Sequence, residues 1–193
     1  MKQRIEEKLR HYERKKIIDR NLKPAAVLML LFYDKGQYHV LFTERSDKVN
    51  FHKGQVCFPG GTPQPGDPNL LQTALRETEE EIGLRAEDVN ILGELDDSVT
   101  FSTNYLISPF VAFIPYPYPF RANSKEVEQI FSVPLSALMG EANFSQGYYP
   151  TDDRAGPGYA YEYEGHIIWG ATARILKQFT ELLRSGTESG ALR

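Results

Sequence analysis

Hydrophobic residues recur along the chain with two different periods, which predicts a mixture of helices and strands. Near the N-terminus, Ile5, Leu9 and Tyr12 lie among charged residues at spacings of three and four. This period is typical of an amphipathic helix, which we expect within residues 1–17. We expect this helix to pack against the rest of the chain or to contact a second copy of it in a homodimer.

Apolar runs of strand length follow, separated by residues that favour turns. We expect strands over residues 24–33, 38–45, 54–58, 89–95, 107–114, 127–133, 159–163 and 166–169. The turns Asp34-Lys35-Gly36 and Glu164-Gly165 predict that the first two and the last two of these strands form hairpins. Residues 143–158 are polar, aromatic and rich in Gly and Pro, so we expect a long surface loop there.

Further segments have helical periodicity. We expect helices over residues 70–82, 135–139 and 171–183, and a frayed tail over residues 185–193. Asp67-Pro68 supplies an N-cap and a first-turn proline for the first of these helices, and Gly83 supplies its stop. Residues 59–68 are too dense in Gly and Pro for regular structure. Strands interspersed with helices predict an α/β or α+β fold with a mixed central sheet.

Composition limits the number of domains, the cellular compartment and the kind of ligand that we expect. The chain has 193 residues, of which 41% are hydrophobic, and this fits a single domain over residues 1–193. Its longest apolar run, Ala25–Tyr33, is too short to span a bilayer, and its charged N-terminus is unlike a secretory signal. The single cysteine, Cys57, cannot form an internal disulfide, so we expect a cytoplasmic protein. The net charge of −4 disfavours a nucleic-acid partner and leaves a small anionic molecule as the expected ligand.

The acidic run from Arg76 to Glu81 is the segment that most clearly indicates chemistry. On a helix, Glu77, Glu80 and Glu81 are three and four residues apart, so their carboxylates converge on one face, opposite an apolar stripe. Glu79 is left toward solvent. Like charges at these spacings destabilise a helix by roughly 0.2–0.5 kcal/mol per pair. Arg76 offsets part of this repulsion, and a hard divalent cation such as Mg²⁺ or Mn²⁺ would offset the rest.

Acidic residues on an exposed helix are more often a solvated surface than a metal site. The segment Phe58-Pro59-Gly60-Gly61, upstream of the helix, reverses that expectation. It places two residues without side chains at the end of a strand, where the backbone carbonyl of Gly60 or Gly61 can approach an ion closely. A strand, a glycine turn and an acidic helix together predict a metal site.

The loop and helix over residues 60–84 resemble the Nudix box. Its usual form is Gly, five residues, Glu, seven residues and then Arg-Glu-apolar-any-Glu-Glu-any-Gly-apolar. The second half matches position by position from Arg76 to Leu84, with Thr78 at an apolar position. In the first half Asp67 replaces the Glu, eight residues separate it from Arg76, and we expect it to take over the role of that Glu at the helix start. The resemblance implies a Nudix-type α/β/α sandwich and a pyrophosphohydrolase.

The chemistry that this resemblance implies is attack by water on a diphosphate, with divalent metal ions bridging the phosphate oxygens. The metal ligands would be Glu77, Glu80 and Glu81, with the carbonyl group of Gly60 or Gly61 as a further ligand. Arg76 would orient a glutamate through a charge-assisted hydrogen bond. The general base would be Glu77 or Glu126, although Glu126 is equally well interpreted as an ordinary loop residue.

A second pattern lies upstream of the box and resembles the signature of the coenzyme A pyrophosphatase branch of the family. Its matching residues are Leu41, Thr43, Arg45, Ser46, Gly54 and Phe58-Pro59-Gly60-Gly61. Asn50 stands where that branch usually has Arg, which removes one expected phosphate contact. Arg45 and Lys53 remain as cations that can hold the 3′-phosphate or the diphosphate of the substrate, with Ser46 beside them. The segment from Tyr161 to Leu176 also resembles the branch.

The branch resemblance implies cleavage of the diphosphate linkage of coenzyme A or a derivative, giving 4′-phosphopantetheine and adenosine 3′,5′-bisphosphate. Two alternatives stay open. Another Nudix hydrolase would act on ADP-ribose, a dinucleotide or a nucleoside triphosphate, because the box is common to all of these enzymes. A non-catalytic nucleotide-binding module would keep the fold without turnover, although it would have no need for the repulsion among the box glutamates.

Overall fold

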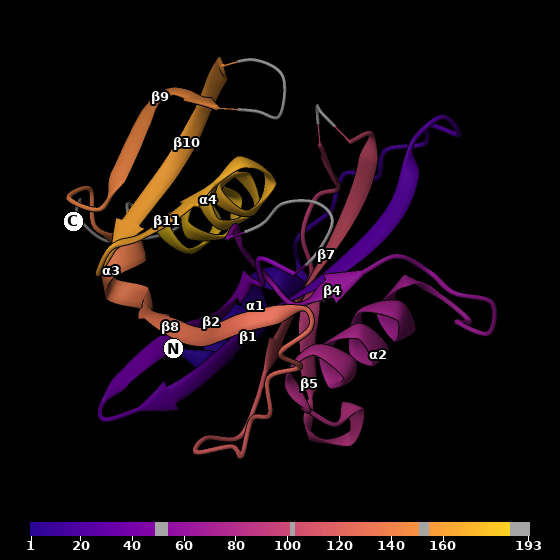
Figure 1. Ribbon diagram of the computed structural model, residues 1–193. Helices are drawn as coiled ribbons and strands as arrows, with labels where there is room; N and C mark the ends of the chain where they lie inside the picture. Colours follow the sequence, from indigo (N-terminus) through magenta and orange to yellow (C-terminus); the bar gives the residue numbers. More distant parts are fainter. Residues whose placement is uncertain (49–53, 101–102, 151–154, 186–193) are drawn as a thin grey trace.

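The computed structural model of the chain describes residues 1–48, 54–100, 103–150 and 155–185, with a β-sheet at its centre (Figure 1). Within these residues the sheet has eight strands. They are β1 (Lys23–Asp34), β2 (Gln37–Arg45), β3 (Val56–Cys57), β4 (Gly60–Gly61), β5 (Asn90–Glu94), β6 (Ser98–Val99), β7 (Tyr105–Phe113) and β8 (Val127–Pro134). The path runs β3-β2-β1-β7-β5, while β4 pairs with β1, β6 with β7 and β8 with β2. The β1 and β7 pair is parallel and the others are antiparallel, which confirms the mixed sheet.

The central strand, β1, divides the hydrophobic core in two. Leu28, Met29, Leu30 and Leu31 have no exposed surface. Because successive side chains of a strand point to opposite faces, Leu28 and Leu30 join one core cluster, and Met29 and Leu31 join the other. Burial on both faces is the physical reason for the continuous apolar run in this part of the sequence.

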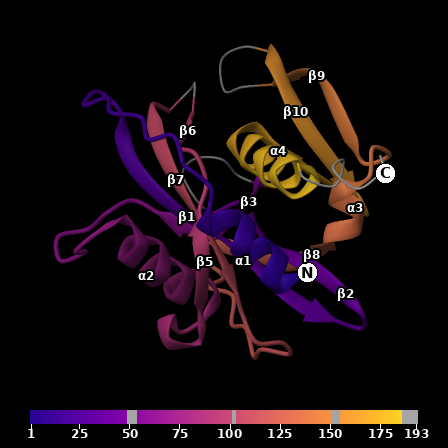
Figure 2. The same ribbon diagram turned by 180° about the vertical axis from the view of Figure 1, so that it is seen from behind.

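Helices cover both faces of the sheet (Figure 1 and Figure 2). The helix α2 (Leu70–Ile82) packs on the face that carries Leu28 and Leu30. On the opposite face, α1 (Lys2–Arg10) and α4 (Gly170–Arg184) contribute Ile5 and Phe179 to the other core cluster. This arrangement confirms the expected layered fold of helices and strands around a mixed sheet.

A smaller sheet lies beside α4 and extends its layer (Figure 1). Its described strands are β9 (Phe144–Pro150), β10 (Ala155–Tyr163) and β11 (His166–Trp169). The helix α3 (Leu135–Met139) leads into it from β8, and the short 3-10 helix η1 (Ala86–Asp88) follows α2. His166 stacks on Phe131 of β8 with 3.9 Å between ring centroids, and its Nδ1 lies 3.4 Å from Glu44 Oε2. These contacts join the β10 and β11 hairpin to the main sheet.

The expected surface loop over residues 143–158 is wrong, because most of this stretch pairs as β9 and as the first part of β10. β9 is an edge strand, and the part of β10 before Ala160 pairs with β9 alone, so along this stretch each strand has one side without a partner strand and Gly and Pro are tolerated. Phe144 lies opposite Tyr161 in the ladder, and their ring centroids are 5.2 Å apart. Cross-strand aromatic contacts stabilise a pairing that the local composition does not predict.

The N-terminal helix is shorter than expected, since α1 ends at Arg10. The next residues are held by the turn after β5. Tyr12 Oη and the backbone N of Lys15 both donate to Asp96 Oδ1, at 2.9 Å and 2.7 Å. The backbone N of Asp97 donates to the carbonyl oxygen of Lys15 at 3.1 Å. These tertiary hydrogen bonds override the helical period of the sequence.

Other predicted elements are close to the observed ones. The helices expected over residues 70–82 and 135–139 coincide with α2 and α3, and the one expected over residues 171–183 is one residue longer at each end. Both predicted hairpins form, with positive φ angles at their turn residues. Residues 186–193 of the predicted tail lie outside the described residues. None of the described helices combines the length and hydrophobicity that crossing a bilayer requires.

Candidate active site

The acidic helix α2 is capped at both ends. Asn69 is its N-cap, and the side-chain Oδ1 accepts a hydrogen bond from the backbone N of Gln72 at 3.0 Å. Gly83 ends the helix in the left-handed conformation, with a φ of 71°. The expected N-cap role of Asp67 is therefore wrong, because the helix begins later and Asn69 satisfies its first turn.

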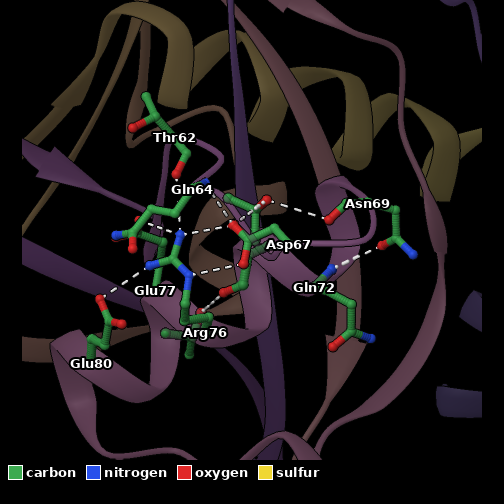
Figure 3. A network of polar contacts seen from close by, with 11 residues as sticks. Thr62, Gln64, Asp67, Asn69, Gln72, Arg76, Glu77 and Glu80 are labelled. Carbon is green, nitrogen blue, oxygen red and sulfur yellow. Dashed lines mark hydrogen bonds and ion pairs between the residues drawn. The ribbon is translucent and has the colours of Figure 1, made fainter.

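Asp67 instead holds the guanidinium group of Arg76 (Figure 3). Arg76 Nε donates to Asp67 Oδ1 at 3.1 Å, and Arg76 Nη2 donates to Asp67 Oδ2 at 3.0 Å, which makes a bidentate pair. The backbone N of Gln64 and the Thr73 hydroxyl also donate to Oδ2, at 2.9 Å and 3.0 Å. The hydrogen bonds from Arg76 and Gln64 hold the pKa of Asp67 well below its usual range. Asp67 therefore stays ionised and fixes the orientation of Arg76.

The rest of the Arg76 guanidinium group faces the glutamates of α2 and the loop before it (Figure 3). Its Nη2 lies 2.9 Å from Glu77 Oε1, and its Nη1 lies 3.1 Å from Glu80 Oε2. Nη2 also donates to the carbonyl oxygen of Thr62 at 3.1 Å. These are the contacts that an orienting role for Arg76 requires, and that role stays a prediction.

Gly60 and Gly61 bring the sheet close to the carboxylates of α2. They form β4 and pair with Ala26 and Val27 of β1, so part of the stretch expected to be irregular is a short strand. A Cβ atom on Gly61 would lie 2.5 Å from the Glu77 carboxyl carbon, and one on Gly60 would lie 2.2 Å from the carbonyl oxygen of Ala26. The backbone of Ala26 cannot give way, so Gly60 must be glycine, whereas a side chain at Gly61 would displace the Glu77 carboxyl group from its position in the site. The role of the two glycine carbonyls as metal ligands stays a prediction.

Glu81 is buried between α2 and the sheet, with 3% of its surface exposed. Its Oε2 accepts a hydrogen bond from the backbone N of Gly60 at 3.2 Å. Burial raises the pKa of Glu81 from 4.5 to about 8; the Gly60 hydrogen bond and the charge of Arg45 oppose this shift, and the charges of Glu77 and Glu126 add to it. The expected placement of all three box glutamates opposite the apolar face is therefore wrong for Glu81, whose position on the helix turns it toward the sheet.

Glu77 and Glu80 differ in their exposure. The Glu77 side chain is 14% exposed, whereas the Glu80 side chain is 51% exposed. Burial is the main cause that raises the pKa of Glu77, and Arg76 opposes the shift. Glu79 faces solvent, as expected. Glu77 therefore lies inside the site and Glu80 at its rim.

Glu126 is distant from α2 along the chain and close to it in space. Its charge contributes to the raised pKa of both Glu77 and Glu81. The backbone N of Asn123 donates to the carbonyl oxygen of Glu81 at 2.8 Å, and the backbone N of Glu126 donates to Asn123 at 2.9 Å. These hydrogen bonds fasten the Glu126 loop to the end of α2. The structure thus brings together Glu77, Glu81 and Glu126, which include both candidates for the general base.

The residues expected to bind the substrate are placed in different ways. Arg45 ends β2, and its charge acts on the Glu81 carboxylate. Ser46 has no exposed surface, and its backbone N donates to the carbonyl oxygen of Glu126 at 2.9 Å. The burial of Ser46 favours a structural role for its side chain. Lys53 and Asn50 lie outside the described residues.

The site offers the oxygen donors that a hard divalent cation prefers. Among the described residues, however, no three Asp, Glu, His or Cys side chains already converge as a ready-made metal site. The reason lies partly in Arg76, which pairs with an oxygen of Glu77 and with an oxygen of Glu80. Glu77 and Glu81 are the residues that would hold a cation, and the exposed Glu80 would join them by rotating away from Arg76.

The sequence does not predict the roles that Asp67 and Asn123 have in the site. Asp67 stands at the position of the usual box Glu, so the sequence indicates that its carboxylate has a role. The sequence does not predict that this carboxylate pairs with Arg76. Asn123 acts through its backbone hydrogen bonds and through its side-chain Nδ2, which donates to Glu126 Oε1 at 3.4 Å, and these contacts depend on the path of the chain through space. No sequence signal identifies such a residue.

Comparisons with known proteins agree on one family. The model of the NUDIX domain matches residues 22–153. The chain is 36% identical over 170 residues to the uncharacterized Nudix hydrolase NudL of Photorhabdus laumondii, covering 86% of this chain and 88% of that protein. The NudL protein of Yersinia enterocolitica is 37% identical over 164 residues, covering 83% of this chain and 82% of that protein.

Solved structures share the fold. A MutT/nudix family protein from Enterococcus faecalis has a TM-score of 0.55 and 18% identity, covering 91% of this chain and 66% of that chain. The MutT protein from Methanosarcina mazei has a TM-score of 0.51 and 18% identity, covering 90% of this chain and 96% of that chain. The domain match, the NudL relatives and the acidic helix lead to one conclusion: the chain belongs to the Nudix hydrolase family, pyrophosphohydrolases that generally use divalent metal ions.

Proposed function

We propose that this Nudix enzyme hydrolyses the diphosphate linkage of coenzyme A or a close derivative. The products would be 4′-phosphopantetheine and adenosine 3′,5′-bisphosphate. The observation that carries the proposal is the position of the branch pattern next to the carboxylates. β2 ends at Arg45, whose carbonyl oxygen accepts a hydrogen bond from the backbone N of Gly54 at 3.0 Å, and Ser46 bonds to the Glu126 loop. Ser46 and Gly60, which both belong to the branch pattern, thus bond to Glu126 and Glu81, and this supports the proposal.

The cofactor in this proposal is Mg²⁺ or Mn²⁺. Glu77 and Glu81 would hold it, with Glu80 and a carbonyl group of Gly60 or Gly61 as further ligands. When bound, such an ion neutralises charge on the diphosphate and lowers the pKa of a bound water. Arg76, fixed by Asp67, would orient Glu77 through their ion pair at 2.9 Å, while Glu80 would turn from Arg76 toward the ion.

Glu126 is the general base that we favour. Glu77 Oε1 lies 2.9 Å from the guanidinium group of Arg76, so this oxygen is already engaged in an ion pair. Glu126 Oε1 accepts a neutral hydrogen bond from Asn123 Nδ2 at 3.4 Å and lies in a loop that faces the same carboxylates. In this assignment Glu126 takes the proton of the attacking water, and Glu77 acts as a ligand.

The cellular setting follows from the sequence. We place the reaction in the cytoplasm because the single cysteine, Cys57, sets no requirement for an oxidising compartment. The partner is a small nucleoside diphosphate, and neither a membrane nor a nucleic acid is part of the proposal. A homodimer contact through α1 stays a prediction.

The test is a substrate panel with product identification by mass spectrometry. The purified protein is incubated with coenzyme A, dephospho-coenzyme A, ADP-ribose, NADH and diadenosine polyphosphates, each with Mg²⁺ or Mn²⁺. We expect coenzyme A to give the two products named above. Consumption of ADP-ribose or a dinucleotide without cleavage of coenzyme A would refute the branch assignment and leave the family intact. Thermal stabilisation by a nucleotide without any hydrolysis would favour a binding module.

A further inference from the structure

We infer that Asn123 is a positioning residue, which holds the carboxyl group of Glu126 in place to take the proton of the attacking water. The inference rests on the proposed function, which assigns the general base to Glu126. It adds a residue to the site that belongs neither to the box nor to the branch pattern. The contacts that carry it fasten Asn123 to α2, orient its amide group, and leave the Glu126 carboxylate with a single partner.

The backbone of Asn123 is fastened to the end of the helix that carries the metal carboxylates. The last carbonyl groups of a helix lack partners within the helix. Here the backbone N of Asn123 donates to the carbonyl oxygen of Glu81 at 2.8 Å, and the backbone N of Arg121 donates to that of Ile82 at 2.9 Å. Both hydrogen bonds join backbone atoms, so they persist when the side chain of Asn123 is changed.

Asn123 also closes the turn that leads to Glu126. Its carbonyl oxygen accepts hydrogen bonds from the backbone N of Glu126 at 2.9 Å and from that of Val127 at 2.8 Å. On the other side, the carbonyl oxygen of Glu126 accepts from the backbone N of Ser46, the residue after β2, at 2.9 Å. The backbone of Glu126 is thus held from two sides, and only its side-chain torsions are free to vary.

The turn fixes the orientation of the Asn123 amide group. Its Oδ1 accepts a hydrogen bond from the backbone N of Lys125 at 3.2 Å, the local contact that Asn often makes in a turn. In the opposite orientation Nδ2 would face that backbone N, and both groups are donors. Nδ2 is therefore directed at Glu126, and it lies 3.4 Å from Glu126 Oε1.

The Glu126 carboxylate depends on this donor. Within the part of the chain that the structure describes, Asn123 Nδ2 is its only hydrogen-bond or ion-pair partner. The carboxylate is also repelled by its neighbours, since its charge adds to the effect of burial in raising the pKa of Glu77 and of Glu81. A flexible glutamate side chain that is repelled on this side needs a fixed partner to stay in the site.

A neutral donor suits a general base. The guanidinium group of Arg76 engages Glu77 in an ion pair at 2.9 Å, whereas the amide group of Asn123 brings no charge to Glu126. The carboxylate is thus oriented while its charge stays available for the proton. The hydrogen bond of 3.4 Å is long, as catalytic hydrogen bonds often are before the substrate binds, and we expect it to shorten in the substrate complex.

The experiment removes the amide donor and keeps the turn. Asn123→Ser retains a neutral oxygen that can accept from Lys125, but its side chain is too short to reach Glu126. With the substrate that the panel identifies, kcat should fall about ten- to a hundredfold, as for other residues that orient a functional group. KM and Mn²⁺ affinity, measured by calorimetry, should stay within about twofold of the wild type, because the contact acts on the reaction step and the backbone bond to Glu81 remains.

A double variant shows whether the effect passes through Glu126. Glu126→Gln alone should lower kcat by about a hundred- to ten-thousandfold, the usual contribution of a general base. In that background, Asn123→Ser should lower kcat by less than about twofold more, because the group that it positions is gone. Ser124→Ala, at the exposed neighbour in the same turn, is the matched control and should keep kcat within about twofold of the wild type.

Other results overturn the inference. If the losses from Asn123→Ser and Glu126→Gln multiply in the double variant, Asn123 acts independently of Glu126. A higher KM together with weaker Mn²⁺ binding and a lower Tm would assign Asn123 a structural role. Wild-type kcat in Asn123→Ser would show that the amide group is not needed, and wild-type kcat in Glu126→Gln would refute the base and the inference with it.

The contact can also be tested without turnover. If the wild type hydrolyses no substrate of the panel, the proposed function fails by itself. The side-chain amide signal of Asn123 in NMR spectra, assigned by its loss in Asn123→Ser, should shift in Glu126→Gln because the charge beside it is removed. An unchanged signal would refute the placement of Asn123 against Glu126, whatever the substrate.

Discussion

The helices α2 and α4 lie on opposite sides of the same sheet, and both are amphipathic, yet they bury different chemistry. The apolar residues that α4 buries are Ala173, Ile175, Leu176, Phe179 and Leu183. α2 buries Ala74, Leu75 and Ile82, but also Thr73, Thr78 and the carboxyl group of Glu81. Burying a carboxyl group without a compensating charge destabilises the folded state, whereas burying a phenyl ring stabilises it.

The two helices contribute differently to the stability and to the catalytic activity of the protein. The α4 layer uses its buried positions for hydrophobic contacts, so its residues should determine the free energy of unfolding. The α2 layer gives up one buried position to a carboxylate whose pKa is raised to about 8. Substitutions in α2 should therefore change catalysis more than stability, and substitutions in α4 should do the reverse.

The largest effect on stability is expected from Phe179→Ala. Phe179 has no exposed surface, and removing its ring would lower the free energy of unfolding by about 3–5 kcal/mol through lost burial and a cavity. Urea unfolding measures this loss, and kcat/KM at a temperature where the variant is folded should be unchanged. A loss below about 1 kcal/mol would contradict the role assigned to the α4 layer, since it would be typical of a surface position.

The reverse pattern is expected from Glu81→Gln. The substitution keeps the shape of the side chain and removes a charge from the metal site, so kcat/KM should fall by about a hundred- to a thousandfold. Glu80→Gln, at the exposed rim, serves as the matched comparison and should lose less, about tenfold, because Glu80 is a solvent-exposed ligand that must first leave Arg76. Equal rates for wild type and both variants at limiting Mg²⁺ would refute the metal site.

Glu81 also predicts how the stability of the metal-free protein depends on pH. Its pKa is 4.5 in ordinary surroundings and about 8 in the folded protein. Between these values the unfolded chain has released the proton and the folded chain retains it, so rising pH favours the unfolded state. The free energy of unfolding should fall between these two pH values, by on the order of a few kcal/mol, and Glu81→Gln should lose this dependence. Parallel pH profiles for the two proteins would contradict the burial of an ionisable group here.

A smaller catalytic effect is expected from Asp67→Asn. The variant loses the charge that holds Arg76 in its bidentate pair, so Arg76 should turn further onto Glu77 and Glu80 and compete with the metal ion. We expect Mn²⁺ affinity and kcat/KM to fall about ten- to a hundredfold, as for other residues that orient metal ligands. Asp67→Glu should restore part of the activity. Wild-type Mn²⁺ affinity in Asp67→Asn would show that Arg76 keeps its orientation without Asp67.

The smallest effect is expected from Asn69→Ala, which removes the N-cap of α2. Loss of the hydrogen bond to Gln72 should lower the free energy of unfolding by about 1 kcal/mol and leave kcat/KM within about twofold, because the carboxylates lie further along the helix. Thermal unfolding of Asn69→Ala and Asn69→Ser checks this, since Ser also caps. Equal destabilisation by both substitutions would indicate that the cap contributes little.

Local patterns predicted much of the fold correctly. The bounds of α2 and α3 agree with the helical period, and the hairpin turns lie where residues with positive φ are expected. Helix period and turn conformation depend on residues that are close in the sequence, so residue types alone predict them. β9 shows where this stops, because its pairing depends on Tyr161 and other residues of β10 that follow later in the chain.

The sequence by itself determined the family, the mixed fold and the set of acidic residues on α2, because the box specifies them by type and spacing. Only the tertiary structure decided how those residues differ: Glu81 is buried, Glu80 is exposed, and Asp67 pairs with Arg76. The physical reason is that burial and electrostatic interaction depend on distances through space, and the packing of α2 against Gly60 and Gly61 sets those distances.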